Sequence, residues 1–183
     1  MLAWVLLLAA ASMPTEGASK KELYLRSKAE REPTRSAVRE AVTVLYARNL
    51  HTHEVMALEG PDVTPEAVDT FLRCWFTEEQ RDIPDELVGR MRATAHHFSA
   101  KQVHIVSGFR HVKYNKLLRK KGREVALQSE HTTGSAIDFS LPGVDVMKVY
   151  KWLLAEHDGG VGFYKGSGFV HIDTGKKRTW KGT

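Results

Sequence analysis

The sequence predicts an α+β domain built on a small, mostly antiparallel sheet. Short apolar segments that suit strands lie close together in the chain, while helical spacing dominates the first half and returns at residues 144–157. The 183 residues are 42% hydrophobic, which is enough for one globular domain with a continuous core and a short extension.

The first predicted elements are a hairpin and two helices. Alternating apolar residues on both sides of the polar turn NLHTHE predict a β-hairpin over residues 42–57. Thr64 is the expected N-cap of a helix that has Pro65 at its first position, because its hydroxyl can accept an unpaired backbone N–H. A second helix is expected from Pro84, with apolar residues at helical spacing along one face.

The second half of the chain alternates between strands and helices, and glycines follow both helices. The predicted elements are strands at 103–106, 135–141, 161–164 and 167–175, and helices at 114–121 and 144–157. Residues 176–182 are expected to form a basic tail behind the final strand.

Residues 1–18 have the features of an export signal. The apolar run from Leu2 to Ala11 is too short to span a bilayer and is followed by small residues and a proline. Residues 19–40 are strongly charged and are expected to be a linker, which leaves 41–183 as the folded domain. We therefore expect a periplasmic or secreted protein with no stable membrane span after signal removal.

Composition limits the kinds of site that the chain can form. Its single cysteine, Cys74, excludes an internal disulfide and a cysteine-rich metal site, so a metal would need histidine and carboxylate ligands. The formal net charge of +5 favours an anionic partner such as nucleic acid, a membrane surface or an acidic cell-wall polymer. No nucleic-acid recognition motif accompanies this charge, so we predict no nucleic-acid partner.

Two predicted strands each place one metal-binding side chain opposite an apolar face. The two-residue period of a strand gives this position to Asp138 in SAIDFS and to His171 in FVHIDT. If the two strands are neighbours, these side chains converge. His131 can join them from a loop that Gly134 allows to double back.

Two imidazoles and one carboxylate support three interpretations. They supply three ligands and leave a position open, which is the arrangement of catalytic zinc sites. The same set forms the triad of non-haem iron oxygenases, although those enzymes are mostly β-barrels and this sequence is rich in helices. In a purely structural interpretation, Asp138 lies on the wet face of a half-buried strand and His131 caps a loop.

Four segments, SGFRHVKYN, SEHTTGSAIDF, GGVGFY and GSGFVHIDTG, occur here in the order typical of the YcbK/MepK-type murein endopeptidases. The sequence resembles this family from about residue 42 to residue 180. The family is related to the D-Ala-D-Ala metallopeptidases, in a superfamily with lysostaphin-like enzymes and the hedgehog signalling domain. Its motif His-x-x-Gly-x-Ala-x-Asp is matched by His131, Gly134, Ala136 and Asp138.

The resemblance implies a hedgehog/D-Ala-D-Ala peptidase-like zinc fold with His131, Asp138 and His171 as zinc ligands. It also implies an exported enzyme that cuts peptide cross-links in peptidoglycan, including those between two diaminopimelate residues. Arg110 is then expected near the metal, where a fixed guanidinium would stabilise the oxyanion. Ser107 begins the same motif and is expected to bind substrate. The structural alternative for Arg110 is a surface ion pair.

The general base of the related peptidases is missing from its usual position. Those enzymes have Glu-x-x-His or His-x-His at the last ligand, where this sequence has Gly168 and Phe169. Asp173 shares a strand face with His171 and is the first candidate, but it could instead hold an imidazole in the ligating tautomer. Glu130 is the second candidate. Without a base, the chain would be a catalytically inactive, metal-stabilised module that binds peptidoglycan.

The remaining aromatic residues and histidines receive simpler roles. Tyr114 is expected to contact substrate because it belongs to the same motif as the arginine. His51 and His157 are expected in solvent or as caps, and Trp75 has the helical spacing of a core residue. Trp180 is expected either to stack on a sugar or to cover the sheet edge.

Overall fold

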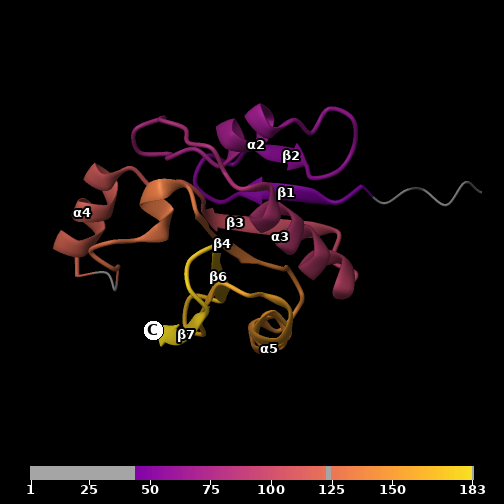
Figure 1. Ribbon diagram of the computed structural model, residues 1–183. Coiled ribbons are helices and arrows are strands. Elements are labelled where there is room, and N and C mark those ends of the chain that lie inside the picture. Colours follow the sequence, from indigo (N-terminus) through magenta and orange to yellow (C-terminus); the bar gives the residue numbers. More distant parts are fainter. Residues whose placement is uncertain (1–43, 123–124, 183) are drawn as a thin grey trace, which may run out of the picture. The chain divides into compact units, whose positions relative to one another are not determined.

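Seven strands form one sheet in the part of the chain that the structure describes. The computed structural model describes residues 44–122 and 125–182, which belong to one compact unit. The predicted export signal and charged linker lie outside these residues. The strands are β1 (Tyr46–Asn49), β2 (Val55–Ala57), β3 (Gln102–Ser107), β4 (Ala136–Ser140), β5 (Gly160–Tyr164), β6 (Phe169–Asp173) and β7 (Arg178–Gly182), shown in Figure 1.

The sheet has the order β2-β1-β3-β4-β6-β5-β7 and is mixed. The pairs β1/β2, β3/β4, β4/β6 and β5/β6 are antiparallel, whereas β1/β3 and β5/β7 are parallel. The predicted α+β class is confirmed, but the sheet is larger and less uniformly antiparallel than expected. One reason is β7, which occupies the residues predicted to form a basic tail. Its sequence has no apolar alternation, so only pairing with β5 reveals it as a strand.

The predicted helices are present within the described residues. They are α2 (Pro65–Phe71), α3 (Asp85–His97), α4 (Val112–Lys120) and α5 (Val146–Glu156). The Thr64 hydroxyl accepts the backbone N–H of Ala67, as its predicted N-cap role requires. Among the described residues, no helix is long and apolar enough to cross a membrane.

The hydrophobic core joins the sheet to α3 and α5. Leu87 and Met91 on α3 and Leu153 on α5 are almost fully buried and belong to the same cluster as the apolar residues of β4 and β6. In Figure 1, α4 lies to the left of the sheet, apart from α3 and α5.

The strand alternation that the sequence predicts positions the polar side chains of β4 and β6. Ile137 and Phe139 on β4 and Ile172 on β6 are fully buried in the apolar core. Successive side chains of a strand point to opposite faces, so Asp138 and His171 point away from that core. The apolar neighbours thus anchor the strands and hold both polar side chains in place.

Candidate metal centre

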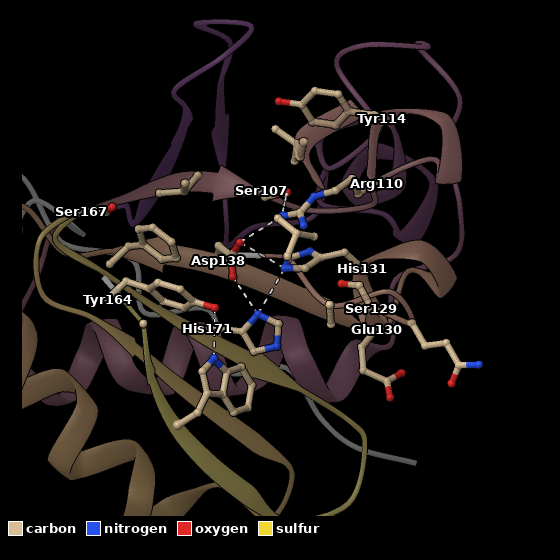
Figure 2. A pocket seen from close by; sticks show the side chains of 18 of the residues that line it. Ser107, Arg110, Tyr114, Ser129, Glu130, His131, Asp138, Tyr164, Ser167 and His171 are labelled. Atoms are coloured by element: carbon tan, nitrogen blue, oxygen red, sulfur yellow. Dashed lines mark hydrogen bonds and ion pairs between the residues drawn. The ribbon is translucent and has the colours of Figure 1, made fainter. Parts of the chain in front are cut away.

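Three side chains from separate elements converge on one face of the sheet. Asp138 on β4 pairs directly with His171 on β6, and His131 comes from the short 3-10 helix Glu130–Thr133. One ligand atom from each residue lies within 4.8 Å of the others, and all three residues are buried. The separations are 2.7 Å from His171 Nδ1 to Asp138 Oδ1 and 3.1 Å from His131 Nε2 to Asp138 Oδ2 (Figure 2). Asp138 is only 5% exposed, so its interpretation as a wet-face residue is wrong.

Gly134 ends the 3-10 helix that presents His131. Its φ of 84° lies in the left-handed region, which favours glycine. A Cβ atom at this position would also lie 2.5 Å from the carbonyl oxygen of Asp82. Both the backbone conformation and the lack of space for a side chain therefore require glycine at this position. The turn brings His131 back toward β4.

Each histidine has one ring nitrogen fixed by a hydrogen bond and the other directed into the cluster. His131 Nδ1 lies 2.7 Å from the carbonyl oxygen of Gly108, which can only accept, so Nδ1 must donate and Nε2 is left to ligate. His171 Nε2 lies 2.9 Å from Asp173 Oδ2, which leaves Nδ1 facing Asp138. Such hydrogen bonds behind an imidazole fix its tautomer for metal binding.

Burial and charge act in opposite directions on these groups. Burial opposes ionisation of Asp138, but His131 and His171 outweigh it and hold the pKa of Asp138 well below its ordinary value. Burial lowers the pKa of His131, which favours the neutral ring that a metal needs. Burial also acts to lower the pKa of His171, but hydrogen bonds to Asp138 and Asp173 outweigh it and raise this pKa. Asp138 is therefore held in its ionised form and His131 in its neutral form, and these are the forms that bind a metal.

Asp173 is fully buried and its carboxylate is saturated with hydrogen bonds. Besides His171, it accepts the backbone N–H groups of Gly160 at 3.2 Å and Gly175 at 2.8 Å. Arg178 donates to it twice, at 3.0 and 2.8 Å. Burial opposes the ionisation of Asp173, but the donors outweigh it and lower its pKa. These contacts suit a residue that holds His171 in position better than one that accepts a proton during catalysis.

Arg110 is buried beside the cluster. Its Nη2 donates to Asp138 Oδ2 at 3.3 Å and to Ser107 Oγ at 3.2 Å, and its Nη1 donates to Asn115 Oδ1 at 3.4 Å. Only 8% of the residue is exposed, so the alternative of a surface ion pair is wrong. The structure thus places Arg110 and Ser107 next to the candidate ligands.

A cavity of about 730 Å³ opens onto the three candidate ligands. Ser107, Arg110, Tyr114 and Glu130 all line it. In Figure 2, Tyr114 stands apart from the ligands, on the side opposite Tyr164. The predicted substrate-binding residues therefore share one cavity with the predicted metal ligands, although Tyr114 does not reach them.

Several residues lie in surroundings that differ from those predicted from the sequence. His157 is the C-cap of α5, as one of its two expected roles requires, but it is not in solvent: it is 4% exposed, and its Nε2 lies 2.8 Å from the carbonyl oxygen of Asp173. Trp180 lies with its ring centroid 5.0 Å from that of His171, and it donates to the Tyr164 hydroxyl at 3.0 Å. Trp75, expected in the core, is 38% exposed. These positions depend on β7 and on loop contacts, for which the local sequence has no periodic signal.

The fold and the site together define a class of protein. A buried set of two histidines and one aspartate at a cleft is the arrangement of mononuclear metallopeptidases. The sequence matches the family described as Peptidoglycan L,D-endopeptidase MepK over residues 39–180, and the chain belongs to this family. The predicted family and the predicted enzyme class, a peptidoglycan endopeptidase among the M15 metallopeptidases, are therefore confirmed.

Individual relatives agree with this assignment. The Peptidoglycan L,D-endopeptidase MepK of Escherichia coli (strain K12) is 35% identical over 144 residues, which cover 75% of this chain and 79% of that protein. A protein of Haemophilus influenzae, named a probable peptidoglycan L,D-endopeptidase MepK, is 42% identical over 81 residues, and the match spans 44% of each chain. No solved structure matches the chain.

Proposed function

We propose that the chain is a zinc-dependent murein endopeptidase that hydrolyses peptide cross-links in peptidoglycan, including those between two diaminopimelate residues. The observation that supports this most strongly is the cluster of His131, Asp138 and His171, whose ligand atoms lie within 4.8 Å of one another at the cavity. Membership of the MepK family supports the substrate.

The donor set fits zinc. It consists of two imidazole nitrogens and one carboxylate oxygen, and the ring nitrogens that would ligate are His131 Nε2 and His171 Nδ1. When bound by such ligands, zinc lowers the pKa of its water to roughly 7 and polarises a carbonyl group, which makes amide hydrolysis feasible at neutral pH. The open sheet of this chain argues against the iron oxygenase alternative, whose enzymes are mostly barrels.

The residues around the ligands have distinct proposed roles. Arg110 stabilises the negative charge that develops on the substrate carbonyl oxygen, because its guanidinium is fixed by Ser107, Asn115 and Asp138 and is largely shielded from water. Ser107 holds this guanidinium and contributes to the substrate-binding wall. Asp173 is a positioning residue that orients the His171 ring.

We assign the general base to Glu130 rather than to Asp173. Glu130 lines the cavity and directly precedes His131, whereas all the hydrogen bonds of Asp173 belong to the supporting structure. Glu130→Gln should abolish proton transfer and leave metal content unchanged. If the variant hydrolyses substrate at the wild-type rate, a group other than Glu130 must be the general base.

The second candidate function is a peptidoglycan-binding module without catalysis. The observation that favours it is that Gly168 and Phe169 stand where the related peptidases have their general base. A digest of purified sacculi, followed by mass spectrometry of the muropeptides, separates the two functions. The enzyme should consume cross-linked dimers when zinc is present, and His131→Ala should not. Dimers that persist with wild-type protein and zinc would support the binding module.

The same digest tests the cross-link, and metal analysis tests the ion. Loss of dimers joined through two diaminopimelate residues is expected, and loss of other dimer types alone would contradict this specificity. Protein purified without added metal should contain zinc, and iron in its place would contradict the proposed ion.

The proposed location is the cell envelope, periplasmic or secreted. It follows from the substrate and from the predicted export signal at residues 1–18, with 19–40 as linker and 41–183 as the peptidase domain. Fractionation of cells that produce the full chain should recover a shortened protein outside the cytoplasm. Full-length protein in the cytoplasm would contradict this location.

We propose no nucleic-acid partner, and added nucleic acid should not change the rate of peptidoglycan hydrolysis.

A further inference from the structure

Four aromatic rings from three separate segments meet at one end of the cleft. His51 comes from the turn between β1 and β2, Trp75 and Phe76 follow α2, and Tyr114 lies in the first turn of α4. We call these four residues the aromatic wall. None of them has a role in the metal centre described above.

The rings of the aromatic wall fix one another. Trp75 stacks on His51 with ring centroids 4.8 Å apart, and it meets Tyr114 edge-on at 5.1 Å. Phe76 stacks on Tyr114 at 5.3 Å and lies nearly perpendicular to Trp75. Stacked and edge-on pairs are the favourable arrangements of aromatic rings, so the wall has a defined shape.

The aromatic wall is partly exposed, and two of its four rings line the cleft. Trp75 is 38% and Phe76 is 47% exposed. Tyr114 stacks on the Phe76 ring, which nevertheless remains 47% exposed. His51 and Tyr114 line the same cavity as His131, Asp138 and His171. Exposed apolar area that adjoins a cleft is typical of a ligand-binding groove.

Polar contacts hold the segment that presents Trp75 and Phe76. The carbonyl oxygen of Cys74 accepts the backbone N–H of Glu78 at 2.8 Å, which closes a turn around the two rings. Arg73, just before this turn, donates to Glu78 at 2.7 Å and to Glu54 on the neighbouring hairpin at 2.9 Å. A surface that is already ordered binds a ligand with little loss of conformational entropy.

The chemistry of the aromatic wall suits the sugar part of murein better than its peptide part. Aromatic faces are electron-rich and attract the C–H groups on the flat side of a sugar ring, whose hydroxyl groups remain in water. A cationic side chain that suits the charged groups of a stem peptide lies at the other end of the cavity, where Lys181 is on β7 with Trp180. In Figure 2 this end is marked by Tyr164, across the ligands from Tyr114.

From this geometry we infer that the aromatic wall binds a sugar ring of the glycan strand while the attached peptide reaches the metal centre. The inference rests on the proposed function, because it assigns one part of the murein substrate to this surface. It makes the wall a specificity site for cross-links that are still attached to glycan.

The test compares two substrates with the same scissile bond. One is a cross-linked muropeptide dimer that retains its disaccharides, and the other is the same dimer after an amidase has removed them. Phe76→Ala should lower the ratio of kcat/KM for the first over the second about fivefold. Tyr46→Ala is the matched control, since Tyr46 is 44% exposed but lies outside the aromatic wall, and it should leave the ratio unchanged. Metal content and the unfolding temperature confirm that each variant is folded.

A second measurement needs no hydrolysis. A tetramer of N-acetylglucosamine, added to the wild-type protein, should change the tryptophan fluorescence, and Trp75→Phe should reduce that change. If wild type cuts neither dimer but binds the tetramer through Phe76, the proposed function fails and the sugar site stands.

Three results would overturn the sugar site. The first is that Phe76→Ala lowers both rates in parallel, which would assign the wall to the peptide or to the fold. The second is that it lowers neither rate while the tetramer leaves the fluorescence unchanged. The third is a dimer of the protein that Phe76→Ala dissociates, because the wall would then bind a second copy of the chain.

Discussion

The two ends of the cleft are built on different principles. At the candidate metal centre, buried side chains on paired strands are fixed by hydrogen bonds, as with His171 and Asp173. At the aromatic wall, half-exposed rings from loops and a helix start are fixed by contact with one another. The first arrangement suits chemistry that needs one geometry, and the second suits recognition that tolerates small shifts. Substitutions at the two ends should therefore have separable effects.

The largest effect is expected from His131→Ala, which removes one of the three candidate ligands. Zinc content should drop and hydrolysis of sacculi should fall below detection, because only two of the three protein ligands of a catalytic zinc site remain. Metal analysis and the muropeptide digest measure both changes. Full activity with bound zinc would disprove the ligand assignment.

Arg110→Lys keeps the positive charge but removes the planar guanidinium that Ser107, Asn115 and Asp138 fix. We expect kcat to fall by about 10²–10³, the magnitude of losing one oxyanion donor. Steady-state kinetics on cross-linked dimers measure this, with zinc content as the control. A kcat within about threefold of wild type would exclude Arg110 from the transition state.

Asp173→Asn tests the support behind His171. The amide cannot satisfy both His171 Nε2 and the two donors of Arg178, so the ring loses its fixed orientation. Zinc affinity should weaken about 10- to 100-fold, and activity should recover when zinc is added in excess. Competition with a chelator measures the affinity. Activity that stays absent in saturating zinc would instead indicate a direct catalytic role.

Gly134→Ala tests the turn that returns His131 to the cluster. The left-handed φ of 84° and the nearby Asp82 carbonyl both oppose a Cβ atom. We expect the free energy of unfolding to fall by about 1–3 kcal/mol, as measured by urea denaturation of the zinc-bound protein. Gly143→Ala is a control with a similar φ of 79° but open space around the position, so the difference between the two variants isolates the steric part. Equal losses would show that space at Gly134 is unimportant.

The smallest effect on the candidate metal centre is expected from a substitution in the aromatic wall, at the opposite end of the cleft. Trp75→Ala removes a half-exposed ring, so stability should fall by no more than about 1 kcal/mol. Zinc affinity, measured by the same chelator competition, should remain within about twofold of wild type. A large loss of zinc affinity would show that the two ends are coupled rather than separable.

The same contrast explains what could be predicted from the sequence. The alternation in SAIDFS and FVHIDT predicts that Asp138 and His171 each lie opposite an apolar face, and the observed register of β4 and β6 pairs them directly. This worked because a strand fixes side-chain direction from local sequence alone. The roles of these residues as metal ligands remain predictions.

Features that depend on distant segments could not be predicted in this way. The position of Trp180 beside His171 requires β7 to pair in parallel with β5, and its own residues show no strand period. Trp75 has helical spacing, but α2 ends at Phe71, so the residue lies in a turn and its ring points to solvent and other rings. His157 follows α5, and only its contact with the backbone of Asp173 explains its burial.

One consequence of the site concerns folding rather than catalysis. His131 and His171 are separated by 40 positions in the chain, and His131 Nε2 lies 3.2 Å from His171 Nδ1. An ion held between them would act as a cross-link that closes a long loop, which an unfolded chain resists through its entropy. Because the unfolded chain lacks a formed site, free zinc at one hundred times its dissociation constant would add about 2.7 kcal/mol to the free energy of unfolding. The apoprotein should therefore melt at a lower temperature than the zinc-bound form. The zinc concentration would then affect the stability of the protein as well as its activity.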